Sequence, residues 1–172
     1  LILVRNRGRL ASLIVGCLHA QKIPVAGLDR LTLTAPLAVS DLLSAIRFVL
    51  QPDDDLTLAC LLVSPLIGWD QERLYRLAAK RAKKERLFDR LRKSEAEKET
   101  WDVIRGWLSK ADFITPYRFL EMLLSGKGEG RRKLLERLGE EARDPINELL
   151  NAALLLESET TPSFQRFLDW FD

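Results

Sequence analysis

Apolar residues recur with helical spacing along most of this chain. After Asn6 they repeat at i, i+3, i+4, i+7 and i+8, which is typical of an α-helix, at Leu10, Leu13, Ile14, Cys17 and Leu18. Short apolar runs without that period flank this segment, at Leu1–Arg5 and Ile23–Val25, and each predicts a strand. From Pro36 onward every apolar stripe is helical. The pattern predicts a mainly α protein, with a strand–helix–strand piece in residues 1–34 and a helical domain in residues 35–172.

Two strands alone do not form a stable sheet. We therefore expect the chain to be a segment of a longer protein that supplies the other strands, an expectation that the apolar start at Leu1 also favours. An unpaired apolar strand tends to recruit another strand. Residues 1–5 are accordingly expected to promote self-association of the isolated chain.

Start signals divide the helical domain into several helices. A capping box is expected where Ser94 is followed by Glu97. Proline in the first turn predicts further starts at Thr115-Pro116, Asp144-Pro145 and Thr161-Pro162. Carboxylates favour a helix N-terminus, so we interpret Asp53–Asp55 as the start of a helix rather than as metal ligands. The Gly-rich stretch at residues 125–130 lacks the spacing of a phosphate-binding loop and is interpreted as a connector between two helices.

The composition excludes several classes of protein. No apolar stretch is long enough to cross a membrane and no secretory leader is present, so a cytoplasmic protein is expected. Cys17 and Cys60 are too far apart for a CxxC metal site, and we expect both to be small core residues. His19, the single histidine, is expected to be structural. Core anchors are expected at the aromatic residues on apolar stripes, namely Trp101, Trp107, Phe119, Phe167 and Trp170.

The order of motifs along the first 80 residues resembles the second half of UvrD-like superfamily I DNA helicases. A strand of the LVR type leads through a helix to an Ile-Pro-Val segment and a glycine. A helix ending in P-x-D-D follows, and then a helix ending in Ser-Pro before another glycine. The matching residues are Leu3, Val4, Arg5, Ile23, Pro24, Val25, Gly27, Asp41, Pro52, Asp54, Ser64, Pro65 and Gly68. The variant VAGLDRLTLTAPLAVSDLL with SPLIG is most similar to helicase–nuclease subunits of the AddA type, which act in double-strand break repair and recombination.

This resemblance implies that residues 1–34 belong to the edge of the second RecA-like motor domain and residues 35–172 to its inserted 2B accessory domain. It implies that the longer protein is an ATP-dependent DNA helicase that uses ATP and Mg²⁺. The motifs that bind these cofactors lie outside the matching segment, so this chain is expected to hold no cofactor and to be inactive alone. The implied partners are DNA, contacted without sequence preference, and a nuclease subunit of the AddB type.

The resemblance also makes Ser64 and Gly68 candidate DNA contacts. In UvrD-like proteins a Gly-Ile-Gly turn grips duplex phosphates through backbone N–H groups, whereas this chain has Gly68-Trp69-Asp70. A carboxylate replaces the second glycine. Asp70 is better interpreted as the N-cap of the next helix.

Charge is concentrated in that next helix. Net charge is 0 over residues 1–71 (six Lys/Arg, six Asp/Glu), +7 over residues 72–93 (ten and three) and −5 over residues 94–172 (eleven and sixteen). In that helix the spacing places five cations on one face roughly 100° wide, namely Arg73, Arg76, Lys80, Lys83 and Lys84. A basic stripe of this kind can follow DNA phosphates without reading sequence. A solvated helix face, or docking of the nuclease partner, would produce the same pattern.

Overall fold

Helices make up most of the described chain. The computed structural model describes Ile14, Leu18, Gln21 and residues 36–79, 81–82, 85–159 and 161–171. The helices are α3 (Leu37–Leu50), α4 (Asp55–Val63), α5 (Gln71–Ala79), α6 (Leu87–Lys93), η1 (Glu95–Glu97), α7 (Lys98–Ala111), α8 (Pro116–Ser125), α9 (Gly130–Leu138), η2 (Glu140–Ala142), α10 (Arg143–Glu159) and α11 (Phe164–Asp169). No strand occurs among these residues, and the mainly α prediction is confirmed.

The predicted strand–helix–strand piece is not supported by the structure. Ile14 and Leu18 are helical, within the segment whose apolar spacing predicts a helix. Both predicted strands, the Leu1–Arg5 edge included, lie outside the described residues, as do Cys17 and His19.

Helix α3 is the centre of the fold. Its buried residues recur with helical spacing but cover a wide arc of the helix, at Ala38, Val39, Leu42, Leu43, Ala45, Ile46 and Phe48. It contacts α4, α7, α9, α10 and α11. Helix formation stops at Leu50 because Gln51 leaves helical geometry just ahead of Pro52, and a residue before proline disfavours the α region.

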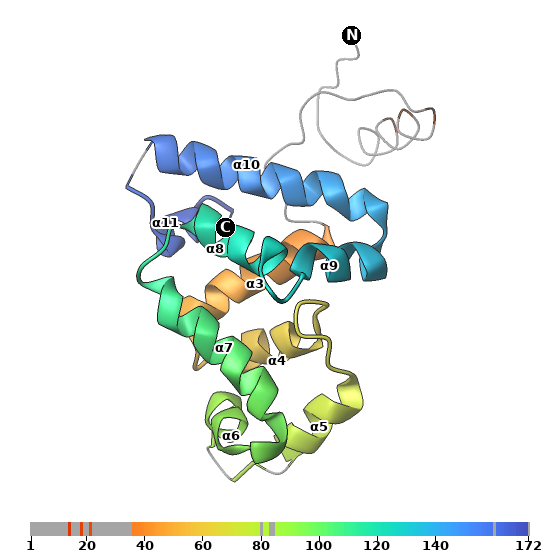
Figure 1. Cartoon of the computed structure of the whole chain (residues 1–172), viewed down its shortest axis with the longest axis vertical. Helices are drawn as coiled ribbons and strands as arrows, with labels where there is room; N and C mark the ends of the chain where they lie inside the picture. The colour runs from red at the N-terminus through yellow and green to blue at the C-terminus, as the bar shows by residue number, and fades with distance from the viewer. Residues whose placement is uncertain are drawn as a thin grey trace.

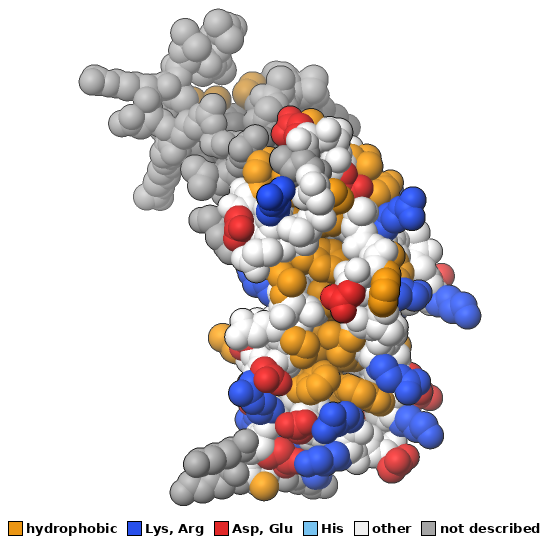
Figure 2. Space-filling view, turned by 90° about the vertical axis from the view of Figure 1, so that its left-hand side faces the viewer, with side chains coloured by type: hydrophobic (Ala, Val, Ile, Leu, Met, Phe, Trp, Pro, Cys, Tyr) orange, Lys and Arg blue, Asp and Glu red, His pale blue; other side chains and the backbone are white. Residues whose placement is uncertain are grey.

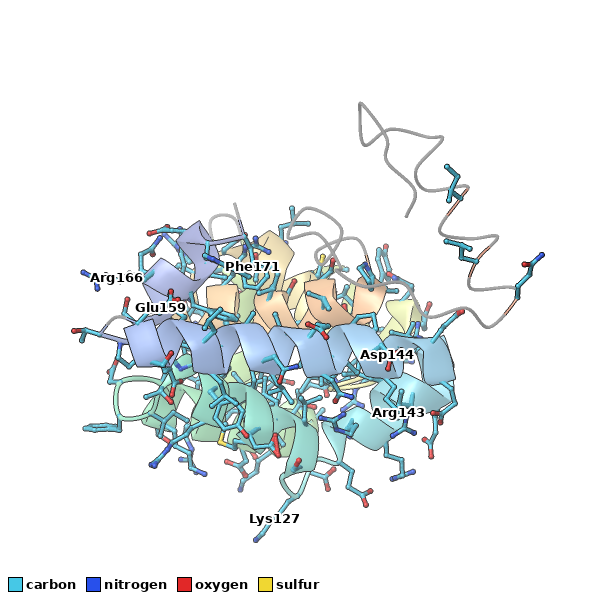
Figure 3. All side chains as sticks on the ribbon, turned by 90° about the horizontal axis from the view of Figure 1, so that it is seen from above. Lys127, Arg143, Asp144, Glu159, Arg166 and Phe171 are labelled. Atoms are coloured by element: carbon cyan, nitrogen blue, oxygen red, sulfur yellow. The ribbon has the colours of Figure 1, made fainter. Side chains whose placement is uncertain are left out.

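The other helices cover α3 in two groups (Figure 1). Helices α4 to α7 pack together at one end of the molecule, and α8 to α11 at the other, with α3 reaching into both groups. Seen from above, α10 lies across the second group, with Arg143 and Asp144 near one of its ends and Glu159 near the other (Figure 3). One continuous hydrophobic core runs through both groups. No helix among the described residues is long and apolar enough to cross a membrane.

Several predicted helix starts are confirmed. The Asp54 side chain accepts from the backbone N–H groups of Leu56 and Thr57 and so caps α4. Thr115 caps α8, with Pro116 as its first residue. Helix α10 begins at Arg143, one residue before the predicted Asp144, and continues from η2.

Two predicted starts are wrong. Ser94 makes no side-chain cap bond and ends α6, so the expected capping box with Glu97 does not form. Helix α11 is capped by Ser163, whose hydroxyl accepts from the Arg166 N–H, and not by Thr161. At the first position Glu97 instead pairs with Arg73, and at the second the cap lies two residues later than predicted.

Most predicted aromatic anchors lie in or beside the core. Phe119 and Phe167 are fully buried, and Trp101 and Trp107 are partly buried against the core. Phe119 also makes an edge-to-face contact with Phe164, which joins α8 to α11. Cys60 is a correction, because it lies exposed on α4 rather than in the core.

Burial on α3 generates a stability prediction. We expect Ile46→Ala to lower the free energy of unfolding by about 2–5 kcal/mol, because Ile46 is fully buried and truncation leaves a cavity. Leu37→Ala on the same helix is the control, since Leu37 is 58% exposed and should cost less than about 1 kcal/mol. Urea denaturation followed by circular dichroism measures both; equal losses would contradict the central position of α3.

Candidate nucleic-acid interface

The Ser-Pro turn after α4 is a tightly bonded structure. Ser64 ends α4, and its buried hydroxyl donates to the carbonyl of Leu61 at 2.7 Å. The Ile67 and Gly68 N–H groups both donate back to the Ser64 carbonyl, and the Trp69 N–H donates to Leu62. Ser64 is therefore a buried structural residue in this structure, and its side chain is not available to contact DNA.

Gly68 is the exposed point of this turn. Its φ of +86° lies in the left-handed region, and a Cβ placed there would meet no atom within 4 Å. The glycine is thus required by backbone geometry and not by close packing. Because its N–H is already bonded within the turn at 2.7 Å, it has no free donor for a phosphate. The backbone grip that the family resemblance implies is absent at residues 67–69.

Asp70 starts α5 as predicted. Its Oδ1 accepts from the Arg73 N–H at 2.6 Å, which is the bond expected of an N-cap side chain. The carboxylate is exposed and directed to its own helix. Asp70 therefore has a local structural role as the cap of α5.

The continuous basic stripe predicted through residue 84 is not formed by α5. The helix ends at Ala79, and Arg81, Ala82, Glu85 and Arg86 are outside any helix. Arg76 is exposed on α5 and forms no ion pair among the described residues. Lys80, Lys83 and Lys84 lie outside the described residues, so the structure does not place them.

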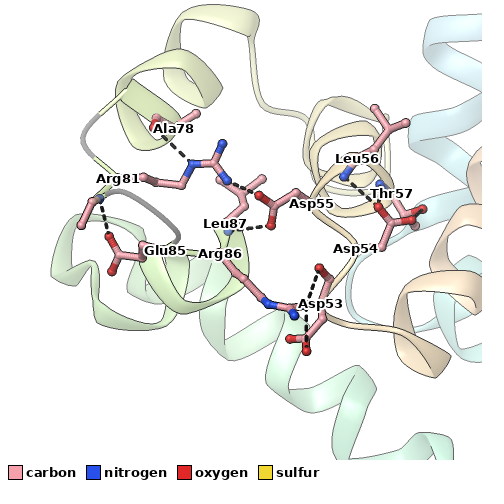
Figure 4. A network of polar contacts seen from close by, with 11 residues as sticks. Asp53, Asp54, Asp55, Leu56, Thr57, Ala78, Arg81, Glu85, Arg86 and Leu87 are labelled. Atoms are coloured by element: carbon pink, nitrogen blue, oxygen red, sulfur yellow. Dashed lines mark hydrogen bonds and ion pairs between the residues drawn. The ribbon is translucent and has the colours of Figure 1, made fainter.

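Carboxylates of the acidic triplet bind the segment that follows α5 (Figure 4). Asp55 pairs with Arg81 and accepts from the backbone N–H of Leu87 at 2.7 Å. Asp53 pairs with Arg86 at 2.9 Å. Asp54, which caps α4, also accepts from the Thr57 hydroxyl, and this bond is the main reason that its pKa is lowered. Asp53 and Asp55 thus join the segment after α5 to the start of α4, whereas Asp54 caps α4 itself.

Arg73 is fixed by the fold. Its guanidinium pairs with Glu97 and lies over the Trp69 ring, 4.5 Å from the ring centroid. Trp69 is itself only 3% exposed and donates from Nε1 to the Thr100 hydroxyl at 3.1 Å. This joint between α5 and α7 was not predicted from the sequence. The sequence around Glu97 fits a capping box with Ser94 equally well, so the contact with Arg73 could not be identified from it.

Helix α9 packs against the turn. A Cβ at Gly130 would lie 2.3 Å from the Leu123 carbonyl oxygen and 3.0 Å from Cδ2 of Leu66, so only glycine allows this approach. On the same face of α9, Lys133 donates to the Leu66 carbonyl at 3.5 Å and Arg137 to the Val63 carbonyl at 3.4 Å. The contact of these two cations with the turn could not be predicted from the sequence, because more than 60 residues separate them from it.

Asp41 of α3 lies close to Arg137. Burial raises the pKa of Asp41 to about 6, and the charge of Arg137 opposes that rise. Its Oδ2 atom is buried without a hydrogen-bond partner among the described residues. Asp41 thus places a partly desolvated carboxyl near Arg137.

The sequence was compared with protein-family models and with curated proteins. No protein-family model matches it, and no curated protein matches it in sequence. Within the described residues, no group of three His, Cys, Asp or Glu side chains could hold a metal ion. The function must be argued from the motifs and surfaces described above.

The α5–α7 joint predicts a specific loss of stability. Thr100→Val removes the acceptor of a buried indole N–H while keeping the shape of the side chain, so we expect a loss of about 1–3 kcal/mol in the free energy of unfolding. Thr100→Ser keeps the hydroxyl and is the matched control. Denaturant titrations of both variants test this; a Val variant as stable as the Ser variant would show that the bond contributes nothing.

The raised pKa of Asp41 predicts that the stability difference between the wild type and an Asp41→Asn variant depends on pH. Because the folded state holds the Asp41 proton more tightly than the ordinary carboxyl does, stability falls as pH rises from the usual pKa of 3.8 to about 6, and it stays lower above that. Asp41→Asn cannot ionise. After allowing for solvent screening of this half-exposed group, we expect the variant to be about 1 kcal/mol more stable than the wild type at pH 7.5.

At pH 4 the two proteins should be equally stable, because the folded wild type is then protonated at Asp41. Subtracting wild type from variant at each pH removes the contribution of every other carboxyl. A difference that does not change between the two pH values would contradict the assignment.

Proposed function

We propose that this chain is the helical accessory part of an ATP-dependent, UvrD-like DNA helicase of the AddA type, which contacts DNA without reading its sequence. In the longer protein this part follows the edge of the second motor domain, to which residues 1–34 are assigned. ATP and Mg²⁺ would act in the motor, outside this chain. The chain alone would be inactive, and its location would be the cytoplasm.

Motif residues with defined structural roles support the resemblance. Asp54 caps α4, Ser64 closes it, and Gly68 supplies the positive φ of the turn. These roles are what a shared helix–turn–helix path would require of those residue types. The order of motifs thus agrees with the way in which α3, α4 and the turn are built.

The observation that carries DNA contact is the arrangement of cations around the exposed turn. Helix α9, the turn and α5 lie along the same side of the molecule (Figure 1). Arg76 of α5, and Lys133 and Arg137 of α9, form no ion pair among the described residues. Cations without carboxylate partners are available to phosphates, and such contacts are independent of base sequence.

A second candidate is docking of a nuclease partner of the AddB type. Hydrophobic side chains form a band down the middle of another face of the molecule (Figure 2). Large apolar side chains are also exposed individually, with Phe113 at 85%, Leu56 at 74% and Tyr75 at 67%. Exposed apolar surface is common at protein interfaces. The two functions use different surfaces and are compatible in one domain.

A salt titration separates the two. We expect weak binding to duplex DNA of any sequence, with affinity falling steeply as salt rises. Changing Lys80, Lys83 and Lys84 to Ala should lower affinity for all sequences alike and flatten the salt slope by roughly one unit for each phosphate that is no longer bound. Fluorescence anisotropy at several salt concentrations measures both effects.

The matched control replaces Lys98, Lys110 and Lys127 with Ala. These lysines are exposed on α7 and on the α8–α9 loop, so the net charge changes equally. Lys127 extends from the tip of its loop, away from the helices (Figure 3). If the control flattens the slope as much as the first triple variant, net charge alone explains binding. Retention by the partner subunit without DNA binding would favour the docking function.

A further inference from the structure

A shallow groove lies between the exposed turn and α9. Its volume is about 350 Å³, and its lining residues come from segments far apart in the sequence: Pro65, Ile67, Gly68, Lys133, Glu136 and Arg137. The close approach of Gly130 to Leu66 fixes the helix against the turn. From Gly130, Lys133 and Arg137 follow at three and seven residues, so all three share the face of α9 that meets the turn.

The basic side chains of α9 differ in whether they are paired with carboxylates. Arg132 is neutralised by Glu129 and Glu136, and Arg131 donates to the Asn147 side chain at 2.8 Å. Lys133 and Arg137 form no ion pair within the described residues, although Arg137 is attracted to Asp41 and Lys133 to Glu129. Neither of the two cations that face the groove is therefore held in an ion pair as Arg132 is.

Lys133 and Arg137 also have more N–H donors than the hydrogen bonds described for them require. An ammonium group has three N–H donors and a guanidinium has five. Lys133 makes one hydrogen bond to a carbonyl of the turn and Arg137 one to the last carbonyl of α4, and both bonds are long, at 3.5 and 3.4 Å. Bonds of this length are weak, so the remaining donors can turn toward a stronger acceptor. Phosphate oxygens are such acceptors, and a charge-assisted hydrogen bond is about twice as strong as a neutral one.

We propose that Lys133 and Arg137 bind a backbone phosphate of duplex DNA in this groove, beside Gly68. The proposal rests on the function proposed above and names the groups that make the contact. The turn cannot supply them, since the N–H groups of residues 67, 68 and 69 are bonded within it. Gly68 contributes open space, because it carries no side chain where the phosphate would approach. Glu136 is the one acidic group of the groove, and it limits the affinity.

The test is a salt titration of fluorescein-labelled duplex DNA, followed by anisotropy. Lys133→Gln with Arg137→Gln removes both groove cations and should flatten the salt slope by roughly one unit, because the contact with one phosphate is lost. The charge-retaining swap, Lys133→Arg with Arg137→Lys, should restore the wild-type slope. Arg118→Gln with Arg131→Gln removes the same charge from outside the groove and should leave the slope unchanged. Glu136→Gln should tighten binding.

Each outcome decides the proposal. A flattened slope in the groove variant, with the swap and the control behaving as stated, supports it. DNA binding that is unchanged in the groove variant overturns it but leaves the proposed function standing. Wild-type protein that binds no DNA at any salt overturns both. Circular dichroism of every variant separates these results from unfolding, and a swap that folds but fails to restore binding also overturns the proposal.

Discussion

The burial of α3 is the constraint on which the rest of the structure depends. At about 100° per residue, its buried side chains extend around more than half of its circumference. One layer of helices cannot cover so wide an apolar surface, so two groups must approach it from different sides. The turn at residues 64–69 and the start of α9 meet where these groups adjoin. The candidate groove is thus a consequence of how α3 is covered.

Charge in this protein is largely used to fix connections between helices. Asp53 and Asp55 hold the segment after α5, and Glu97 holds Arg73 over the buried Trp69. Exposed ion pairs add little stability individually, so their effect is mainly on where segments lie. A count of basic residues consequently overstates the charge available to a polyanion. What matters is which cations are not held in an ion pair.

Local signals in the sequence were sufficient for much of the fold. The apolar spacing from Leu37 to Leu50, the cap at Asp54 and the Thr115-Pro116 start each depend on residues within one or two turns. Predictions failed where a distant residue competed. Glu97 binds Arg73 instead of capping a helix, and α5 ends at Ala79 while the Asp55 carboxylate holds Arg81 and Leu87. The pairing of the turn with α9 likewise had no local signal.

A shallow groove with two cations suits a supporting contact better than a recognition site. It offers donors for a phosphate but no enclosed, apolar surface against which a base could be buried, so discrimination between sequences is not expected of it. Each such contact is also weak at physiological salt. An accessory domain that must release DNA repeatedly as a motor advances benefits from weak contacts, because a tight site would oppose every step. The modest character of the groove is therefore consistent with the role proposed for it.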